Sequence, residues 1–407
     1  MPRRVVITGL GVVCALGGDV PALTAGLVDG RCGIGPLTLF PYQGRCRSAA
    51  QVPEAVPAAT GMLPRATARR LSRPDRFALA AATEACRMAG LDAGLRRAAA
   101  LAVGATTGGM FETEEVYRRR RAGEERRFRL SRVLGTPLST AAVAVSQVLG
   151  IYGPQATLST ACSSSALAVV RAADAIRRGE ARVALALGTD GLCRLTYAGF
   201  DALQALDPDR CRPFDRERRG LSLGEGAAAL VLEDAEHARA RGARARAAFL
   251  GSGTATDAHH PTAPHPEGRG ALAALHAALA SAAVPPEAVD YVNAHGTGTL
   301  QNDAVEVRVL RAVFGSRLPH IPVSSTKSQL GHCLGAAGAV EAVVTVLALD
   351  EGIVPPTVNL RAPDPAWADL DLVCTPGRRA PLGAALTSSY GFGGHNVTLV
   401  LGRAEGR

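Results

Sequence analysis

Short β-like runs punctuated by glycine alternate with Ala- and Leu-rich stretches along the whole chain, and this alternation constrains the fold more than any other feature. Apolar residues with helical spacing fill residues 76–88, 166–178, 269–282 and 337–349. The β-like runs cover residues 5–8, 99–103, 183–187, 228–232, 289–293, 322–325 and 397–401. Strands that alternate with helices predict an α/β fold in which helices cover both faces of parallel sheets.

A faint internal similarity predicts two related halves. The run at residues 245–253 has a Gly-rich exit like that of the opening run. The chain has 407 residues, which is enough for two or three domain-sized units or one duplicated lobe. We therefore expect an N-terminal half at residues 1–250 and a C-terminal half at residues 251–407.

Composition narrows the possible partners and location. No stretch approaches the roughly 20 apolar residues that cross a bilayer, and the first residues do not resemble a secretory leader. We therefore expect a cytoplasmic protein without a membrane partner. The nine cysteines have irregular spacings, which favours small buried thiols over a disulfide framework or a structural zinc site. The net charge of +9 suggests an acidic partner. Nucleic acid is disfavoured because no recognition motif accompanies the basic residues.

Cys162 lies in the segment 158–167, where a strand-like approach turns sharply into a helix of small residues that continues to Arg178. At a helix start, unpaired backbone N–H groups and the helix dipole favour a thiolate. This position suits a nucleophile. The alternative is one more buried core cysteine.

Two further segments carry histidines. His295 follows a strand and precedes a Gly/Thr loop with Thr297 and Thr299, whose hydroxyls can bind amides or phosphate. It could be a base, a donor or a structural imidazole. His332 lies five residues after Lys327, at another strand end. Two imidazoles and a thiol in one crevice suit thioester chemistry. A zinc site competes with this interpretation but lacks the usual ligand spacing, so we expect no metal.

A Gly-rich turn lies between two strands at residues 388–396 and includes Gly391, Phe392 and Gly393. Such a turn can direct backbone N–H groups at an anion. By itself it is equally compatible with a simple hairpin.

The order and separation of these motifs resemble the β-ketoacyl synthase family of the thiolase superfamily, especially 3-oxoacyl-[acyl-carrier-protein] synthase II. The resemblance spans the chain, including residues 5–11, 212–215, 224–227 and 391–394. Residues 161–165 and 295–299 read more like polyketide ketosynthases, and residues 301–303 resemble discrete ketosynthases of aromatic polyketide systems. The resemblance implies a thiolase-like fold, with two βαβαβ halves in a layered αβαβα arrangement around central helices.

The resemblance also implies roles for individual residues. Cys162 would be acylated, and His295 and His332 would support decarboxylation of a malonyl unit. Lys327 and Glu306 would form a pair that organises the site. Backbone N–H groups of Cys162 and Phe392 would form an oxyanion hole, and Phe392 would also gate the pocket. Thr297, Thr299, Gly391 and Gly393 would contact the substrate, whose phosphopantetheine arm belongs to the carrier protein, so that no metal or organic cofactor is needed.

The implied partners are an acyl carrier protein and a second subunit. The second subunit would be another copy of the chain or a ketosynthase-like chain-length subunit. Carrier proteins of this family are acidic, and basic side chains in two segments could receive one. These are Arg65, Arg69, Arg70 and Arg73, together with Arg126 and Arg127 in a segment that reads as a solvated excursion, residues 117–132.

Three rival functions fit less well. A non-catalytic chain-length subunit would lack the nucleophile. A degradative thiolase would use a second active-site cysteine. A starter-condensing synthase would pair its cysteine with His and Asn, and Asn396 lies beyond the Gly-rich turn.

Overall fold

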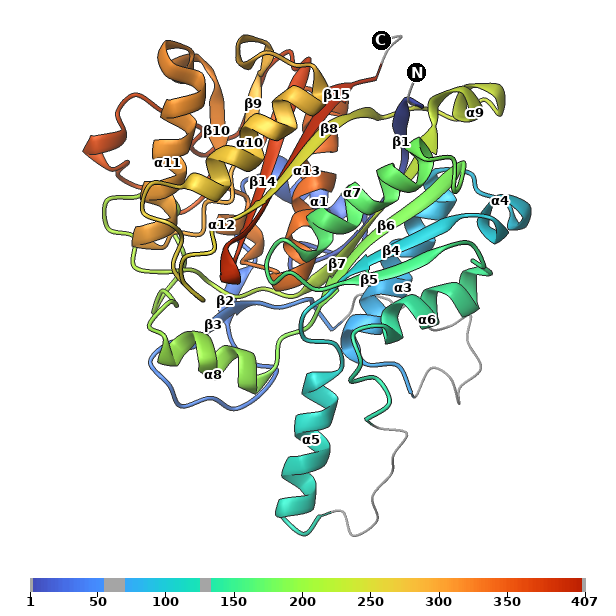
Figure 1. The fold of residues 1–407 in the computed structure, drawn as a ribbon. Helices are drawn as coiled ribbons and strands as arrows, with labels where there is room; N and C mark the ends of the chain where they lie inside the picture. The colour runs from blue at the N-terminus through green and yellow to red at the C-terminus, as the bar shows by residue number, and fades with distance from the viewer. Residues whose placement is uncertain (1–2, 55–69, 125–132, 405–407) are drawn as a thin grey trace.

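The computed structural model describes residues 3–54, 70–124 and 133–404, and most of its strands form one sheet of 11 strands (Figure 1). The order across the sheet is β12-β10-β9-β14-β15-β8-β1-β7-β6-β4-β5. The strands are β1 (Val5–Val13), β4 (Ala100–Gly104), β5 (Gln155–Leu158), β6 (Val183–Asp190), β7 (Gly226–Asp234), β8 (Ala247–Thr256), β9 (Tyr291–Asn293), β10 (Pro322–Ser324), β12 (Asp371–Leu372), β14 (Ala384–Gly391) and β15 (His395–Arg403). Two small pairs lie outside it: β2 (Ile34–Pro36) with β3 (Ser48–Ala50), and β11 (Ile353–Val354) with β13 (Arg378–Arg379).

The prediction of parallel sheets is right only for the two ends of this sheet. β5, β4 and β6 are parallel, as are β12, β10, β9 and β14. The central pairings between β6 and β14 are all antiparallel. The apolar pattern could not reveal this, because a fully buried strand such as β6 reads as a continuous apolar run in either direction.

Helices separate and cover the two parts of the sheet. α7 (Ser164–Arg177) packs on β4 and β6, and α13 (Ala337–Glu351) packs on α7, β7 and β14, so both lie between the two parts. On the outer faces, α3 (Arg73–Met88) covers β1 and β7, and α10 (Arg269–Ala282) covers β8 and β15. The layered αβαβα architecture with central helices is therefore confirmed (Figure 1).

The remaining helices are mostly short. They are α1 (Val20–Val28), α4 (Ala93–Arg97), α5 (Met110–Arg121), α6 (Thr140–Leu149), α8 (Arg194–Ala202), α9 (Ala235–Ala240), α11 (Leu300–Phe314) and α12 (Lys327–Leu330). Helix starts follow local chemistry. α3 begins three residues earlier than its apolar spacing predicts, because Ser72 and Asp75 form a capping box ahead of it.

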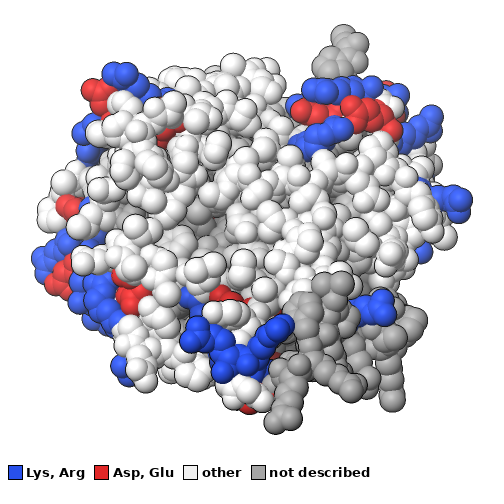
Figure 2. Space-filling view, turned by 60° about the horizontal axis from the view of Figure 1, so that its bottom comes forward, with Lys and Arg blue, Asp and Glu red and all other residues white. Residues whose placement is uncertain are grey.

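α5 projects away from the body of the molecule (Figure 1). Its last turn carries Arg118, Arg119, Arg120 and Arg121, all exposed, and within the helix only Val116 is buried. The expected solvated excursion is thus described as far as residue 124. Figure 2 shows Lys and Arg side chains gathered at the lower edge of this face, beside the grey residues, while charged side chains are sparse at its centre. Among the described helices, none is long and apolar enough to cross a membrane.

Candidate active site

Cys162 lies in the tight connection between β5 and α7. Ala161 has a φ of +51°, a left-handed conformation that a side chain disfavours, so the turn must be held by its surroundings. Ser164 provides part of that support: its Oγ accepts from the Thr160 N–H at 2.8 Å and donates to the Ala161 carbonyl at 2.6 Å. The small residues that follow Cys162 in the sequence therefore shape the turn.

Close packing fixes the start of α7 against the sheet. A Cβ atom on Gly104 of β4 would lie 2.4 Å from the backbone of Ser164 and Ser165. No side chain fits there, so glycine allows the helix that follows Cys162 to contact the strand directly. The nucleophile candidate is positioned by the rigid core.

Burial controls the protonation of Cys162. The side chain is 6% exposed, and desolvation raises its pKa to about 11, although a hydrogen bond from the Phe392 N–H and the charge of Lys327 act in the opposite direction. The expectation that the helix start favours a thiolate is therefore wrong for the resting site. Burial therefore favours the thiol over the thiolate at this position.

The Gly-rich turn forms the wall opposite Cys162. A Cβ on Gly391 would lie 2.8 Å from the Thr160 carbonyl oxygen and 3.2 Å from the Cys162 nitrogen, so the two turns touch through backbone. Gly393 has a φ of +83°, which glycine adopts without strain. The Phe392 ring stacks on Phe200 of α8, with centroids 5.4 Å apart.

His332 has a defined tautomer. Its Nδ1 accepts a hydrogen bond from the Leu334 N–H at 3.1 Å, so in the neutral ring Nε2 carries the proton. That Nε2 is buried and has no partner among the described residues. Burial, and then the charge of Lys327, lower the pKa of His332 well below 6.5. The ring is therefore a neutral N–H donor.

His295 lies across from it, with ring centroids 5.5 Å apart and planes nearly perpendicular. Burial, Lys327 and His332 together lower its pKa well below 6.5. Its Nδ1 also has no partner among the described residues. Two neutral imidazoles thus keep hydrogen-bonding capacity for a ligand.

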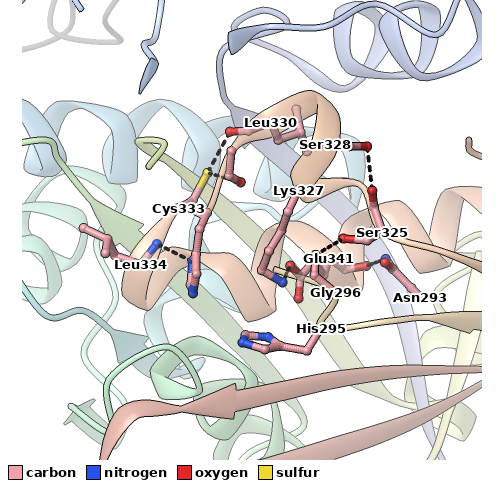
Figure 3. A network of polar contacts seen from close by, with 12 residues as sticks. Asn293, His295, Gly296, Ser325, Lys327, Ser328, Leu330, Cys333, Leu334 and Glu341 are labelled. Atoms are coloured by element: carbon pink, nitrogen blue, oxygen red, sulfur yellow. Dashed lines mark hydrogen bonds and ion pairs between the residues drawn. The ribbon is translucent and has the colours of Figure 1, made fainter. Parts of the chain in front are cut away.

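The predicted pairing of Lys327 with Glu306 is wrong. Lys327 Nζ forms a buried ion pair with Glu341 of α13, and Figure 3 shows its side chain reaching from α12 toward Glu341, with His295 close by. Glu306 instead accepts from the backbone N–H groups of His295 and Gly296, both at 2.7 Å. Burial raises the pKa of each carboxyl to about 7.

Glu341 is the site residue that the motifs missed. The sequence does mark Glu341, because it is the one charged residue in the apolar run 337–349. A charge in a buried helix needs a partner. The structure shows that this partner is Lys327.

A cavity of about 430 Å³ connects these groups. Cys162, His295, His332 and the turn residues Gly391, Phe392 and Gly393 line it, together with Thr297 and Thr299. The Oγ1 atoms of the two threonines lie 2.9 Å apart. Lys327 and Glu306 do not line the cavity but lie beside the imidazoles. Asn396 does line it, yet its amide donates to Asp257 and to the Gly394 carbonyl, within the wall.

The arginines proposed to dock a carrier protein differ in whether the structure describes them and in how exposed they are. Arg65, Arg69, Arg126 and Arg127 lie outside the described residues, and Arg70 is exposed. Arg73 is not available to a partner, because its guanidinium binds the buried Glu225 at 2.6 Å and also the Val52 carbonyl. The Arg73 prediction is therefore wrong, since this side chain anchors the start of α3.

A buried thiol that shares a cavity with two neutral imidazoles, at the helix start of a layered αβαβα fold, defines a condensing enzyme of the acyltransferase class. Within the described residues, no group of three or more His, Cys, Asp or Glu side chains could hold a metal ion. The chain belongs to the beta-ketoacyl synthase family: residues 2–238 match its N-terminal domain and residues 246–361 its C-terminal domain. The family predicted from the motifs is thus confirmed.

Relatives cover nearly the whole chain. Nodulation protein E of Rhizobium meliloti strain 1021 is 40% identical over 98% of this chain and 99% of its own. The 3-oxoacyl-[acyl-carrier-protein] synthase 2 of Synechocystis is 38% identical over 98% of this chain and 97% of its own. A putative polyketide beta-ketoacyl synthase of Streptomyces cyaneus is 40% identical over the full length of both chains.

Solved structures of ketosynthases match the fold of this chain over nearly its whole length. The ishigamide ketosynthase/chain length factor matches with a TM-score of 0.92 and 35% identity, over 99% of this chain and all of that chain. A type II PKS ketosynthase in complex with its acyl-carrier protein and bound to the hexaketide matches with a TM-score of 0.88 and 30% identity, over 99% and 100%. The thiolase-like fold class is confirmed by these matches.

Proposed function

We propose that the chain extends an acyl group held on Cys162 by decarboxylative condensation with a malonyl unit on a carrier protein. The observation that carries this proposal is the shared cavity, in which a thiol meets two neutral imidazoles and one of them has a fixed N–H donor. The product would be a β-ketoacyl thioester on the carrier.

In the first step, the Cys162 sulfur attacks the thioester carbonyl of an acyl-carrier protein. A carbon–sulfur bond to Cys162 forms, the bond to the carrier's thiol breaks, and the Cys162 proton leaves with that thiol. Backbone N–H groups of Cys162 and Phe392 are the proposed donors to the oxyanion. The hydrogen bond from the Phe392 N–H to the thiol supports this role.

In the second step, the carbon–carbon bond to the malonyl carboxylate breaks and CO₂ leaves. The electron pair moves toward the thioester oxygen, where His332 Nε2–H and His295 are the proposed donors. Lys327 favours the neutral imidazoles, because its charge opposes a second positive charge nearby. The carbanion then attacks the acyl carbonyl, the new carbon–carbon bond forms as the carbon–sulfur bond to Cys162 breaks, and the departing Cys162 thiolate takes up a proton from water.

The substrate's phosphopantetheine arm would supply the reacting thiol, so the chain itself needs no resident cofactor. Thr297 and Thr299 are the proposed contacts for the arm, with Gly391 and Gly393 allowing close approach. All nine cysteines are free thiols, as is usual in a reducing compartment, which supports a cytoplasmic location.

A second subunit is part of the proposal. β5 lies at the end of the sheet, and nearby Val143 and Tyr152 are 49% and 70% exposed, so this edge suits strand pairing with another chain. We propose a homodimer, with a heterodimer containing a chain-length subunit as the alternative. The alternative is supported by the match to the ishigamide ketosynthase/chain length factor, in which a ketosynthase accompanies such a factor.

The test is reconstitution. The purified chain is incubated with an acyl-carrier protein and malonyl-carrier protein, alone and with a chain-length subunit, and carrier-bound products are identified by mass spectrometry. A β-ketoacyl product two carbons longer than the starter, together with CO₂, is expected. Activity of the chain alone supports the homodimer, whereas a strict need for the second subunit supports the heterodimer. Acyl transfer without CO₂ release in both mixtures would overturn the condensing role.

A further inference from the structure

We infer that Arg219 binds the phosphodiester group of the carrier's phosphopantetheine arm at the outer end of the cavity. The inference rests on the proposed function, because it concerns the substrate of that site. Arg219 is the single Lys or Arg among the described residues that line the cavity.

The exposure of the lining residues increases from Cys162 toward Arg219, which indicates where the cavity opens to solvent. Cys162 is 6% exposed and Thr297 is 4% exposed, Thr299 is half-buried, and the Arg219 side chain is 56% exposed. A phosphopantetheine arm has its thiol at one end, two amides in the middle and the phosphate at the other end. With its thiol at Cys162 and its amides at the threonines, its phosphate reaches the exposed end of the cavity.

Backbone contacts hold Arg219 beside the threonine loop. The Gly220 N–H donates to the Gly298 carbonyl at 3.1 Å, between Thr297 and Thr299 in sequence. A Cβ on Gly298 would lie 2.9 Å from the Gly220 oxygen, so these two segments pack directly together. The guanidinium therefore belongs to the same wall as the threonines and extends beyond them.

The guanidinium is available to a ligand. Its contact among the described residues is a 3.7 Å ion pair with Asp207, and it makes no hydrogen bond with them. Its five N–H donors suit the oxygens of a phosphate. The other charged side chain in the wall, Asp257, already accepts from the His265 and Gly270 N–H groups and from Asn396.

The experiment uses two small thioesters that lack the carrier protein: an acyl-pantetheine and the matching acyl-4′-phosphopantetheine. Acylation of Cys162 is followed by intact mass at low ionic strength, and kcat/KM is compared between them. For the wild type we expect a preference of about five-fold or more for the phosphorylated thioester, since a charge-assisted contact with phosphate is added.

Three variants locate the preference. Arg219→Gln should lose it while reacting normally with acyl-pantetheine, and Arg219→Lys should keep part of it. Arg244→Gln is the matched control, because Arg244 is 53% exposed, pairs with the buried Asp350 and does not line the cavity. It should behave like the wild type.

The outcomes separate this inference from the proposed function. A wild type that acylates with both thioesters at equal rates, or an Arg219→Gln variant that keeps the preference, overturns the role of Arg219 and leaves the function standing. If neither thioester acylates the wild type, the proposed function fails. Calorimetric binding of phosphopantetheine and pantetheine to the wild type and to Arg219→Gln then decides the phosphate contact by itself.

Discussion

His332 and Cys162 line one cavity but have separable tasks, because one presents an N–H and the other a thiol. His332→Ala should still become acylated at Cys162, whereas condensation should fall by about 100-fold or more through the loss of one oxyanion donor. Acylation is read by intact mass and condensation by product formation. Condensation at the wild-type rate would show that His332 is structural.

The charge of Lys327 predicts a pH dependence. Burial, and then the charge of Lys327, lower the pKa values of His295 and His332, so both imidazoles stay neutral below pH 6.5. An acid inflection of malonyl decarboxylation near pH 7 would therefore belong to the carboxyls of Glu306 and Glu341, and the imidazoles should titrate at lower pH. Removing the charge should raise both pKa values and move the acid limb to higher pH. The variant is Lys327→Met with Glu341→Gln, which leaves no unpaired buried charge. The wild type is the reference, because Glu341→Gln alone would leave Lys327 as an unpaired buried charge. An unchanged acid limb in the double variant would contradict the electrostatic role.

Residue motifs predicted which side chains line the cavity better than they predicted the contacts of the buried charges beside it. Cys162, His295 and His332 stand in short distinctive segments, so their shared cavity could be anticipated. The ion pair of Lys327 with Glu341 spans 14 residues and two helices, and it depends on how α12 and α13 pack. Glu306 is a buried carboxylate like Glu341, but its oxygens accept hydrogen bonds from the backbone N–H groups of His295 and Gly296.

At the level of elements, close packing of α7 on β4 predicts a sensitive glycine. Gly104→Ala would force a Cβ against the backbone of Ser164 and Ser165, and we expect a loss of about 1–3 kcal/mol in the free energy of unfolding. Denaturant unfolding measures it. Gly199→Ala is the control, because Gly199 lies in α8 with open space around its Cα, and should stabilise the chain by about 0.5–1 kcal/mol. Equal effects would contradict the packing argument.

Helices were predicted more accurately than strand directions. α10 coincides with the predicted residues 269–282, and its buried residues recur with helical spacing from Gly270 to Leu279. The sequence predicted strands β7 and β15, but each is two residues longer at both ends in the structure than in the prediction. Their antiparallel partners could not be read from the chain, since buried strands of either direction share one apolar pattern.

At the scale of the whole molecule, the net charge of +9 predicts an electrostatic landing site for an acidic carrier. Reversing Arg69, Arg70, Arg126 and Arg127 to Glu should raise the apparent KM for acyl-carrier protein and leave acylation by a short pantetheine thioester unchanged. Added salt should likewise weaken carrier-dependent turnover more, since screening acts over about 8 Å at physiological ionic strength. Equal loss with both substrates would place the carrier elsewhere.

The division of the chain near residue 250 stays a prediction. It falls within β8, whose short pairing with β1 joins the two parts of the sheet. The α/β class followed from the alternation of strands and helices, and the layered architecture followed from the family resemblance. The joining of both parts into one sheet depends on pairings far apart in sequence.

The most direct test of the account is intact-mass analysis of the wild type and of Cys162→Ala after incubation with an acyl-carrier protein. We predict one added acyl group on the wild type and none on the variant, because Cys162 lines the cavity and the described serines at the start of α7 do not. The Cys162→Ala variant should retain malonyl decarboxylation, which needs the imidazoles rather than the thiol. An acyl group on the variant would contradict the assignment of Cys162 as the nucleophile.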